Sequence, residues 1–369
     1  MSSEKFKEIL SLYNQGKFEE LIQQENTLME EFSQVPLLIN ILAELNLRLG
    51  RFSKAIELYK RVIKLKPDYA EAYNNIGIAF KENSDFTAAI ESYNKAISLN
   101  PHLVQVYNNL GLAFNKLGEY QKSIDAYNKA LELKPDYAEA HNNLGVVYNE
   151  LYKHEEAVIS YNKAIEFNNG YVSAYYNLGN VLKDLGRLDE ALKCFKKALA
   201  INPKYLEAHY SIALIFQEFE QLEEMISHLE AVIKIQPDLS KAHNRIGDAL
   251  QQLGQLNEAI EYYQKAIKFN SKFSEAHNNL GNVYKNIGQF DDAVNSYKKA
   301  LEINPDYPAL HNNLGSAYRD LNQLDNAEKS YKKALEYNPD FPDTLNNLGI
   351  VLFEKGHINK AVKSFKKAI

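Results

Sequence analysis

Apolar residues recur along this chain with the spacing of amphipathic helices. In the stretch 274–307, which reads "SEAHNNLGNVYKNIGQFDDAVNSYKKALEINPDY", His277, Leu280, Gly281 and Tyr284 follow the i, i+3, i+4, i+7 spacing of one helix face. The pattern predicts a first helix that buries this face.

A second apolar stripe follows after a short polar interval. Ala293, Tyr297 and Ala300 again have helical spacing, and Gly288 lies between the two stripes, where a helix ends and a turn begins. Pro305 cannot continue the second helix. The unit is therefore predicted to be helix–turn–helix.

The same unit repeats every 34 residues. With Ser274 taken as position 1, glycine recurs at position 8, alanine at position 27 and proline at position 32. Glycine inside a helix costs roughly 1 kcal/mol relative to alanine, so we expect it to allow a close helix–helix contact. The recurring glycines are Gly77, Gly111, Gly145, Gly179, Gly247, Gly281, Gly315 and Gly349.

This arrangement of Leu-Gly, aromatic, alanine and proline positions resembles the tetratricopeptide repeat. The resemblance implies an all-α, right-handed superhelical solenoid, with first helices lining a concave groove and second helices covering the outside. Frames beginning every 34 residues from residue 2 predict a single array over residues 2–369, of which 36–341 form nine complete repeats.

The two ends of the array depart from the pattern. The frame 2–35 has Ile9 at the glycine position, and we interpret it as an N-terminal capping repeat. The last frame, 342–369, stops after its second helix without a cap, which predicts either that the native chain continues past Ile369 or that this end self-associates. The cap is expected to present an acidic surface formed by Glu19, Glu20, Glu25, Glu30 and Glu31.

The frame 206–239 is degenerate. Ala213 replaces the glycine, Glu220 replaces the turn glycine, and Met225 and Val232 replace small alanines. Larger residues at a close crossing predict a bend or softer joint here. The alternative is that volume losses nearby accommodate them.

Composition limits the classes of partner. Net charge is −6, and no block of like charges is present, which argues against nucleic acid or an anionic membrane as the main partner. No apolar run approaches membrane-spanning length, and the N-terminus lacks the features of a signal peptide. A single cysteine, Cys194, excludes an internal disulfide framework and is interpreted as a packing residue. A cytoplasmic location is expected, and a nuclear one is compatible.

The sequence contains no pattern typical of a catalytic triad, a metal site or a phosphate-binding loop, so we predict neither catalysis nor a cofactor within residues 1–369. Histidine recurs at position 4, where other frames have tyrosine, and is interpreted as a packing residue rather than a ligand. These histidines are His141, His209, His243, His277 and His311.

Asparagines at position 6 are the strongest candidates for function. An asparagine amide both donates and accepts, so a row of them in the groove could grip the backbone of an extended peptide. The row is similar to the asparagine ladder in the repeat arm of O-linked N-acetylglucosamine transferases. The alternative is that these amides bond backbone groups of adjacent helices, and the position-5 residue is expected to face solvent. The position-6 residues are Asn75, Asn109, Asn143, Asn177, Asn279, Asn313 and Asn347.

The row is interrupted at Ser211 and Arg245. Lys241 and Arg245 are spaced i, i+4 on one first helix, and Asn180 lies two frames earlier. The three resemble part of the two-carboxylate clamp of chaperone-binding members of the family, which implies a site for an acidic peptide. Alternatively, the two cations pair with Asp248, Glu207 or Glu275.

Three functions are compatible with these features. The leading hypothesis is a non-catalytic scaffold that binds extended peptide segments of partner proteins. The second is the substrate-recruiting arm of a glycosyltransferase whose catalytic domain lies beyond residue 369. The third is a chaperone co-factor that uses the partial clamp.

Overall fold

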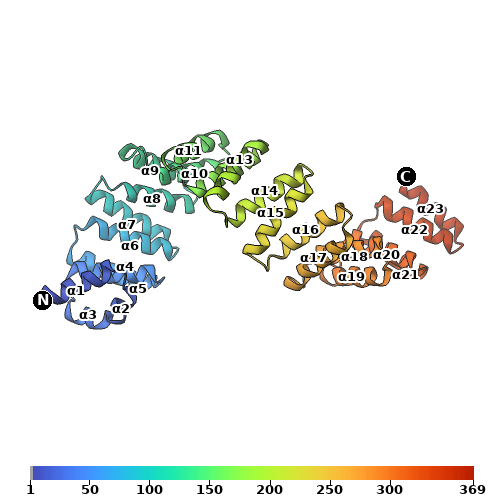
Figure 1. The fold of residues 1–369 in the computed structure, drawn as a ribbon, viewed down its shortest axis with the longest axis horizontal. Coiled ribbons are helices and arrows are strands. Elements are labelled where there is room, and N and C mark those ends of the chain that lie inside the picture. The colour runs from blue at the N-terminus through green and yellow to red at the C-terminus, as the bar shows by residue number, and fades with distance from the viewer. Residues whose placement is uncertain (1–2) are drawn as a thin grey trace. The chain divides into compact units, whose positions relative to one another are not determined.

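The computed structural model describes residues 3–369, with side chains from residue 7 onward. This part of the chain is helical throughout and contains no strand (Figure 1). The N-terminal helices are α1 (Ser3–Asn14), α2 (Phe18–Gln23) and α3 (Glu25–Glu31). The repeats that follow are the pairs α4 (Pro36–Arg48) and α5 (Phe52–Leu65), α6 (Ala70–Glu82) and α7 (Phe86–Leu99), α8 (Val104–Lys116) and α9 (Tyr120–Leu133), α10 (Ala138–Glu150) and α11 (His154–Phe167), α12 (Val172–Asp184) and α13 (Leu188–Ile201), α14 (Leu206–Glu218) and α15 (Leu222–Ile235), α16 (Ser240–Gln252) and α17 (Leu256–Phe269), α18 (Ser274–Asn286) and α19 (Phe290–Ile303), α20 (Pro308–Asp320) and α21 (Leu324–Tyr337), and α22 (Pro342–Glu354) and α23 (Ile358–Ala368).

The helix boundaries follow the 34-residue frames. In α18 and α19, for example, the first helix has 13 residues and the second has 14. From α4 onward, each second helix packs on the first helix of its own repeat. Within each unit, first helices of neighbouring repeats also touch in most cases, as α8 and α10 do. The prediction of an all-α solenoid of helix–turn–helix repeats is confirmed.

The residue at position 15 lies in the turn between the two helices of each repeat and has a left-handed backbone conformation. Gly288 has φ +80° there, as glycine permits. Ser84, Tyr152, Glu220 and Asn322 adopt the same region at φ between +57° and +63° without being glycine. A bulky L-residue pays about 1–2 kcal/mol for this conformation, so Tyr152 is the most costly of these substitutions.

Two compact units make up the chain. The N-terminal unit contains α1–α13 up to residue 201, and the C-terminal unit contains α14–α23 from residue 202. Within each unit, consecutive helix pairs stack one on the next (Figure 1). The boundary precedes the degenerate frame 206–239 by four residues.

The recurring glycine makes room for an aromatic ring. A Cβ atom at Gly281 would lie 2.7 Å from Cε1 of Tyr297, a residue of the second helix that is itself 1% exposed. The same conflict would arise at the equivalent glycines of the other frames, against Tyr or Phe at position 24. The close helix–helix contact expected from the sequence therefore includes a direct contact between the glycine and an aromatic ring of the second helix.

The degenerate frame loses the ring together with the glycine. Ala213 and Leu229 are both fully buried at positions 8 and 24. Leucine is shorter than tyrosine along the direction of the ring, so the alanine has space. The pairing is not obligatory, because Ala43 coexists with buried Tyr59 at the same positions. The smaller Leu229 therefore offsets the larger Ala213, which favours the alternative that nearby volume losses accommodate the substitution. A bend in this frame stays a prediction.

The N-terminal frame differs from its expected surface. Its second helix is divided at Gln24 into α2 and α3, and Glu25 is only 9% exposed. Glu25 occupies position 24, where other frames bury a ring, so the chain turns it inward, and its assignment to the acidic surface was wrong. The other four glutamates are exposed: Glu19, Glu20, Glu30 and Glu31.

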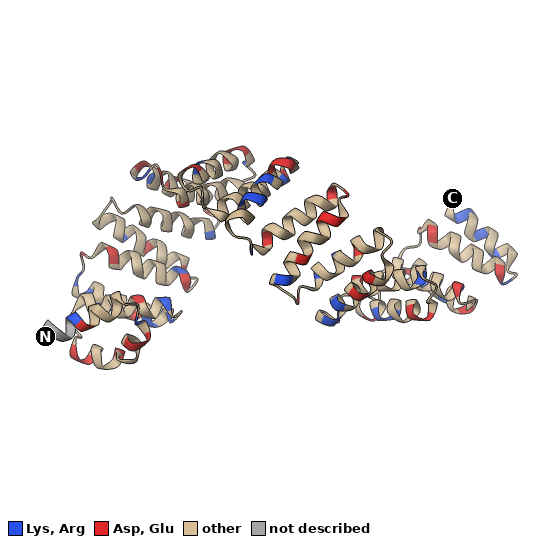
Figure 2. Ribbon diagram, in the orientation of Figure 1, with Lys and Arg blue, Asp and Glu red and all other residues tan. Residues whose placement is uncertain are grey.

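Charged residues of both signs are interspersed along the helices of each unit (Figure 2). In α23 the charged residues are all lysines. Among the described residues, no helix is both long enough and apolar enough to cross a membrane.

Candidate functional site

Asparagines at positions 5 and 6 connect consecutive first helices through their side-chain amides. Nδ2 of Asn143 on α10 donates to Oδ1 of Asn108 on α8 at 3.1 Å. We call this bond, from position 6 to position 5 of the preceding repeat, the amide clasp. It recurs at 3.1 Å from Asn109 to Asn74, from Asn177 to Asn142, from Asn313 to Asn278 and from Asn347 to Asn312.

The position-5 asparagine is the more buried member of two clasps in the N-terminal unit. Asn108 is 1% exposed and Asn142 is 5% exposed, whereas Asn109 and Asn143 are half-buried. The expectation that position 5 faces solvent was wrong, because this residue must lie between two first helices to accept the clasp. Its recurrence has a structural cause, since a buried amide needs such partners.

Further bonds join the clasps into a chain. Asn142 Nδ2 donates to Oδ1 of its neighbour Asn143 at 3.3 Å, and Asn108 Nδ2 donates to Oε1 of Glu139 at 3.0 Å. A continuous path therefore leads from Asn177 through these amides to Glu139. The amides bond side chains of the neighbouring repeat, rather than the backbone groups considered from sequence.

The interruption at Arg245 is a change of chemistry. Position 5 of the preceding repeat is Tyr210, and Arg245 Nε donates to its hydroxyl at 3.0 Å. Arg245 Nη1 also donates to Oε1 of Gln217 at 2.8 Å, and the guanidinium carbon lies 5.9 Å from the centre of the Tyr210 ring. Arg245 thus replaces the amide clasp with a bond to a phenol.

Neither cation of the predicted acidic-peptide site has a carboxylate partner. Within the part of the chain that the structure describes, no ion pair of Lys241 or Arg245 is found inside 4.0 Å, and Lys241 is exposed. Asn180 belongs to α12 in the N-terminal unit, and the two cations belong to α16 in the C-terminal unit. The three-residue site therefore stays a prediction.

Asp248 is a half-buried acceptor within the C-terminal unit. Its Oδ1 accepts from the Tyr263 hydroxyl at 2.8 Å and from Asn279 Nδ2 at 2.9 Å, while Oδ2 accepts from Asn244 at 3.3 Å. Burial raises the pKa of Asp248 to about 6, and the negative charge of Glu275 adds to the rise. Asn279 therefore donates to a carboxylate, whereas five other position-6 asparagines donate to an amide: Asn109, Asn143, Asn177, Asn313 and Asn347.

The position-4 histidines bond the turns between repeats. His141 Nε2 lies 2.9 Å from the backbone carbonyl oxygen of Pro135, so this nitrogen carries the proton. Burial lowers the pKa of His141 and of His277. The same contact, to the residue six positions earlier, occurs at His209, His243, His277 and His311.

Two further observations concern reactive groups. Burial raises the pKa of the Cys194 thiol to about 11, which keeps it protonated and unreactive at neutral pH. In the described residues, no group of three or more His, Cys, Asp or Glu side chains is placed to hold a metal ion.

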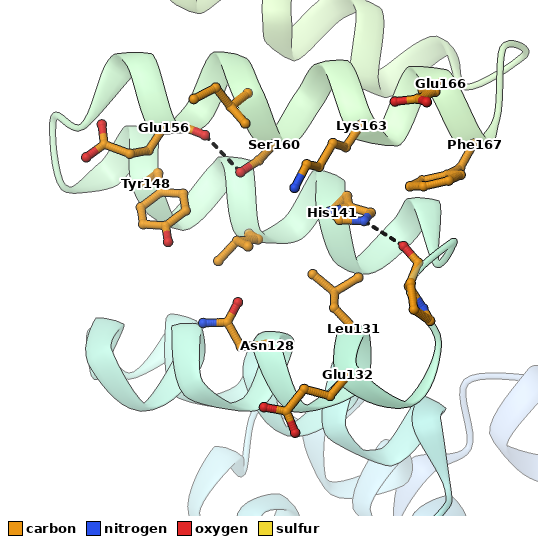
Figure 3. Close-up of a pocket in the computed structure, with 13 residues that line it drawn as sticks. Asn128, Leu131, Glu132, His141, Tyr148, Glu156, Ser160, Lys163, Glu166 and Phe167 are labelled. Atoms are coloured by element: carbon orange, nitrogen blue, oxygen red, sulfur yellow. Dashed lines mark hydrogen bonds between the residues drawn. The ribbon is translucent and has the colours of Figure 1, made fainter.

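A pocket among second helices was missed from sequence. It has a volume of about 770 Å³ and lies between α9 and α11 over α10 (Figure 3). The signal available in the sequence was Ile159, an isoleucine at position 22, where other frames are polar.

Family models match most of the chain. The TPR repeat model matches residues 47–84, 79–118, 111–151, 148–186, 247–288 and 315–356. Three further tetratricopeptide repeat models match residues 172–205 and 274–307, residues 296–329, and residues 206–239. No curated protein matches the chain.

Solved structures with partial similarity include three repeat proteins. MamA is 33% identical, with 45% of this chain and 97% of that one covered and a TM-score of 0.41. YrrB, described as a TPR protein with an unusual peptide-binding site, is 26% identical, with 51% and 96% covered and a TM-score of 0.44. PilF of Pseudomonas aeruginosa is 18% identical, with 55% and 92% covered and a TM-score of 0.49. The family models, with the fold above, show that this chain belongs to the tetratricopeptide repeat family and is built as a protein-interaction scaffold.

Proposed function

We propose that the chain binds extended peptide segments of partner proteins along the face of its first helices that carries the position-6 asparagines. The observation that supports this is the incomplete use of each clasp amide. An amide has two N–H donors and an oxygen with two lone pairs. Asn177, for example, is half-buried and donates one N–H to Asn142. Its Oδ1 accepts no hydrogen bond within the described residues.

The clasp also fixes the amide before a ligand arrives. An asparagine held through one N–H has lost its rotamer freedom already, so a peptide does not have to order it on binding. Adjacent helices pack about 8–10 Å apart, and an extended chain advances about 3.3 Å per residue. One amide would thus meet the peptide about every three residues and bond its backbone largely irrespective of side chains.

The test separates binding from the clasp. Peptides selected by display on the wild-type protein are titrated by calorimetry against N109A/N143A/N177A, which lacks the position-6 amides. The matched control is N74A/N108A/N142A, which breaks the same clasps but retains the position-6 amides. We expect the first variant to lose at least tenfold in affinity and the control to lose less. Equal affinity of the wild type and the first variant would overturn the proposal.

A second binding function has support of its own at Lys241 and Arg245. Arg245 bonds only neutral groups among the described residues, so its charge is not compensated by a carboxylate inside 4.0 Å. An acidic C-terminal peptide would supply that carboxylate. K241E/R245E is expected to abolish binding of a synthetic peptide ending in two acidic residues, and unchanged affinity would exclude this site. Asn180 is left out of this test because it lies in the other unit.

The role as a recruiting arm of a glycosyltransferase stays a prediction. All described residues from 36 onward form repeats, and none of the observations above favours a particular enzyme.

A further inference from the structure

The pocket between α9 and α11 has an apolar centre and polar ends. Leu131 of α9, Leu144 of α10 and Ile159 of α11 are among its lining residues. Figure 3 shows His141 and Phe167 together at one end and Glu156 with Tyr148 at the other. The neighbouring asparagines Asn142 and Asn143 are not part of the lining, so this surface is separate from the clasp face.

Ile159 is exposed at a position that is otherwise polar. Its side chain is 57% exposed, and Phe167 on the same helix is 44% exposed. Single exposed apolar residues are common, but two beside an apolar pocket form a surface suited to being covered. Because they are this open to water, a small ligand would leave them largely uncovered, whereas a protein segment would not. Position 22 in the preceding and following frames is Glu57, Glu91, Asp125, Lys193, Ser227, Glu261, Asn295 and Lys329.

The charges of the lining favour a basic partner. Glu132 is paired with Lys129 at 2.6 Å. Glu156 and Glu166 have no ion pair inside 4.0 Å in the described part of the chain, and neither does Lys163 between them. Ten residues of α-helix separate the two glutamates, about 15 Å at 1.5 Å per residue. An extended segment covers that distance with about five residues.

The equivalent pocket in the C-terminal unit provides an internal comparison. Four repeats later, a pocket of about 330 Å³ lies among α17, α18 and α19. There Gln264 Nε2 donates to the Tyr284 hydroxyl at 3.2 Å, a bond from α17 to α18, and Asn295 replaces the isoleucine. The shared backbone register therefore does not by itself produce the large apolar pocket.

We propose that the pocket between α9 and α11 binds an extended segment of a partner protein that has large apolar side chains with a lysine or arginine on either side, about five residues apart. The apolar side chains fill the space beside Leu131, Leu144 and Ile159. The two basic groups pair with Glu156 and Glu166. The ammonium of Lys163, between the two ion pairs, donates to a backbone carbonyl of the segment. The segment therefore needs no acidic side chain opposite Lys163.

A designed peptide tests this surface directly. The probe is fluorescein-labelled Gly-Lys-Leu-Phe-Ile-Leu-Lys-Gly, and the matched probe has glutamate in place of both lysines. Anisotropy titrations of the full chain are expected to give at least tenfold tighter binding of the lysine probe. I159E should weaken that binding at least tenfold, and E156K/E166K should reverse the preference between the probes. I159E is expected to fold, since glutamate occupies position 22 at Glu57, Glu91 and Glu261.

Two controls make the result specific. N295E, at the equivalent position of the smaller pocket, should leave lysine-probe binding unchanged. N109A/N143A/N177A should also leave it unchanged, so that failure of the asparagine-face proposal does not affect this one. The proposal is overturned if the lysine probe does not bind, if I159E binds it as the wild type does, or if charge reversal leaves the preference intact. Sedimentation showing a wild-type dimer that I159E abolishes would instead assign the pocket to a second copy, and would also overturn it.

Discussion

Two repeats four units apart, 138–171 and 274–307, share a scaffold and differ at its surface. Both place a glycine against a buried tyrosine ring, Gly145 against Tyr161 and Gly281 against Tyr297. Outside that shared core, the first repeat has Ile159, Tyr152 and a clasp to an amide. The second has Asn295, Gly288 and a clasp to a carboxylate. The repeat fixes where side chains lie, and the variable positions decide what each surface can contact.

Transferring the apolar pocket is expected to produce the largest change. Q264N/N295I removes the bond from Gln264 to Tyr284 and restores isoleucine at position 22, while Asp292 and Glu302 already stand where the first pocket has Glu156 and Glu166. The variant should bind two lysine probes per chain instead of one, measured by calorimetric stoichiometry. N295I alone retains the bond and should add a weaker second site. A stoichiometry of one in Q264N/N295I would show that the two substitutions do not account for the difference.

Removing the charge of Asp248 should have the next largest effect. This carboxyl has a pKa of about 6 in the folded chain against an ordinary value of 3.8. Between these values the folded state holds more protons than the unfolded state, so stability falls as pH rises from about 4 to about 6. D248N removes that loss and should raise the free energy of unfolding at pH 7 by about 3 kcal/mol. The gain should vanish near pH 4.

Asparagine can also satisfy most of the bonds at this site. Its oxygen would still accept from Tyr263 and Asn279. The bond from Asn244 Nδ2 at 3.3 Å is lost, but Asn244 keeps its other bond, to Glu275. Urea unfolding followed by circular dichroism at pH 4 and pH 7 measures the difference. The exposed Asp306 provides the control, since D306N should have no such pH dependence. A D248N effect that is equal at both pH values would contradict the assignment. Four repeats earlier the equivalent residue is Leu112, which has no charge to remove.

The repeat fold could be predicted because each rule it obeys is local or periodic. Helical spacing, Gly288 at the turn and Pro305 after the second helix each report on their own repeat. The clasp could not be assigned, because it joins Asn143 to Asn108 in another repeat, and spacing alone does not say which amide faces which. The pocket was missed for a related reason: its size depends on whether residues such as Gln264 and Tyr284 bond across helices.

Breaking one clasp should change the free energy of unfolding by less than removing the charge of Asp248 does. Asn142 accepts from Asn177 and donates to Asn143, so N142A leaves the Asn177 donor without its acceptor. We expect a loss of about 1–2 kcal/mol in the free energy of unfolding. N162A, an exposed asparagine on α11, should change it by less than about 0.5 kcal/mol.

A double-mutant cycle shows whether the clasp itself is responsible. If it is, N142A/N177A should cost less than the sum of the two single variants, because removing both partners leaves no unpaired donor. Additive losses would mean that the amides act independently. N278A in the later repeat should be milder than N142A, since Asn278 is only half-buried.

Exchanging the turn residues should give the smallest effect, and it has opposite signs in the two repeats. Tyr152 has φ +57° and an 84% exposed side chain, and its one ring contact is an edge-on approach to His154 at 6.1 Å. Y152G should therefore stabilise the chain by about 1 kcal/mol, since glycine adopts this region without steric cost. G288Y should destabilise it by a similar amount, because nothing lies within 4 Å of the Gly288 Cβ direction to repay the strain. Chemical denaturation of both variants measures the pair. If Y152G proves destabilising, the ring makes contacts worth more than its backbone strain.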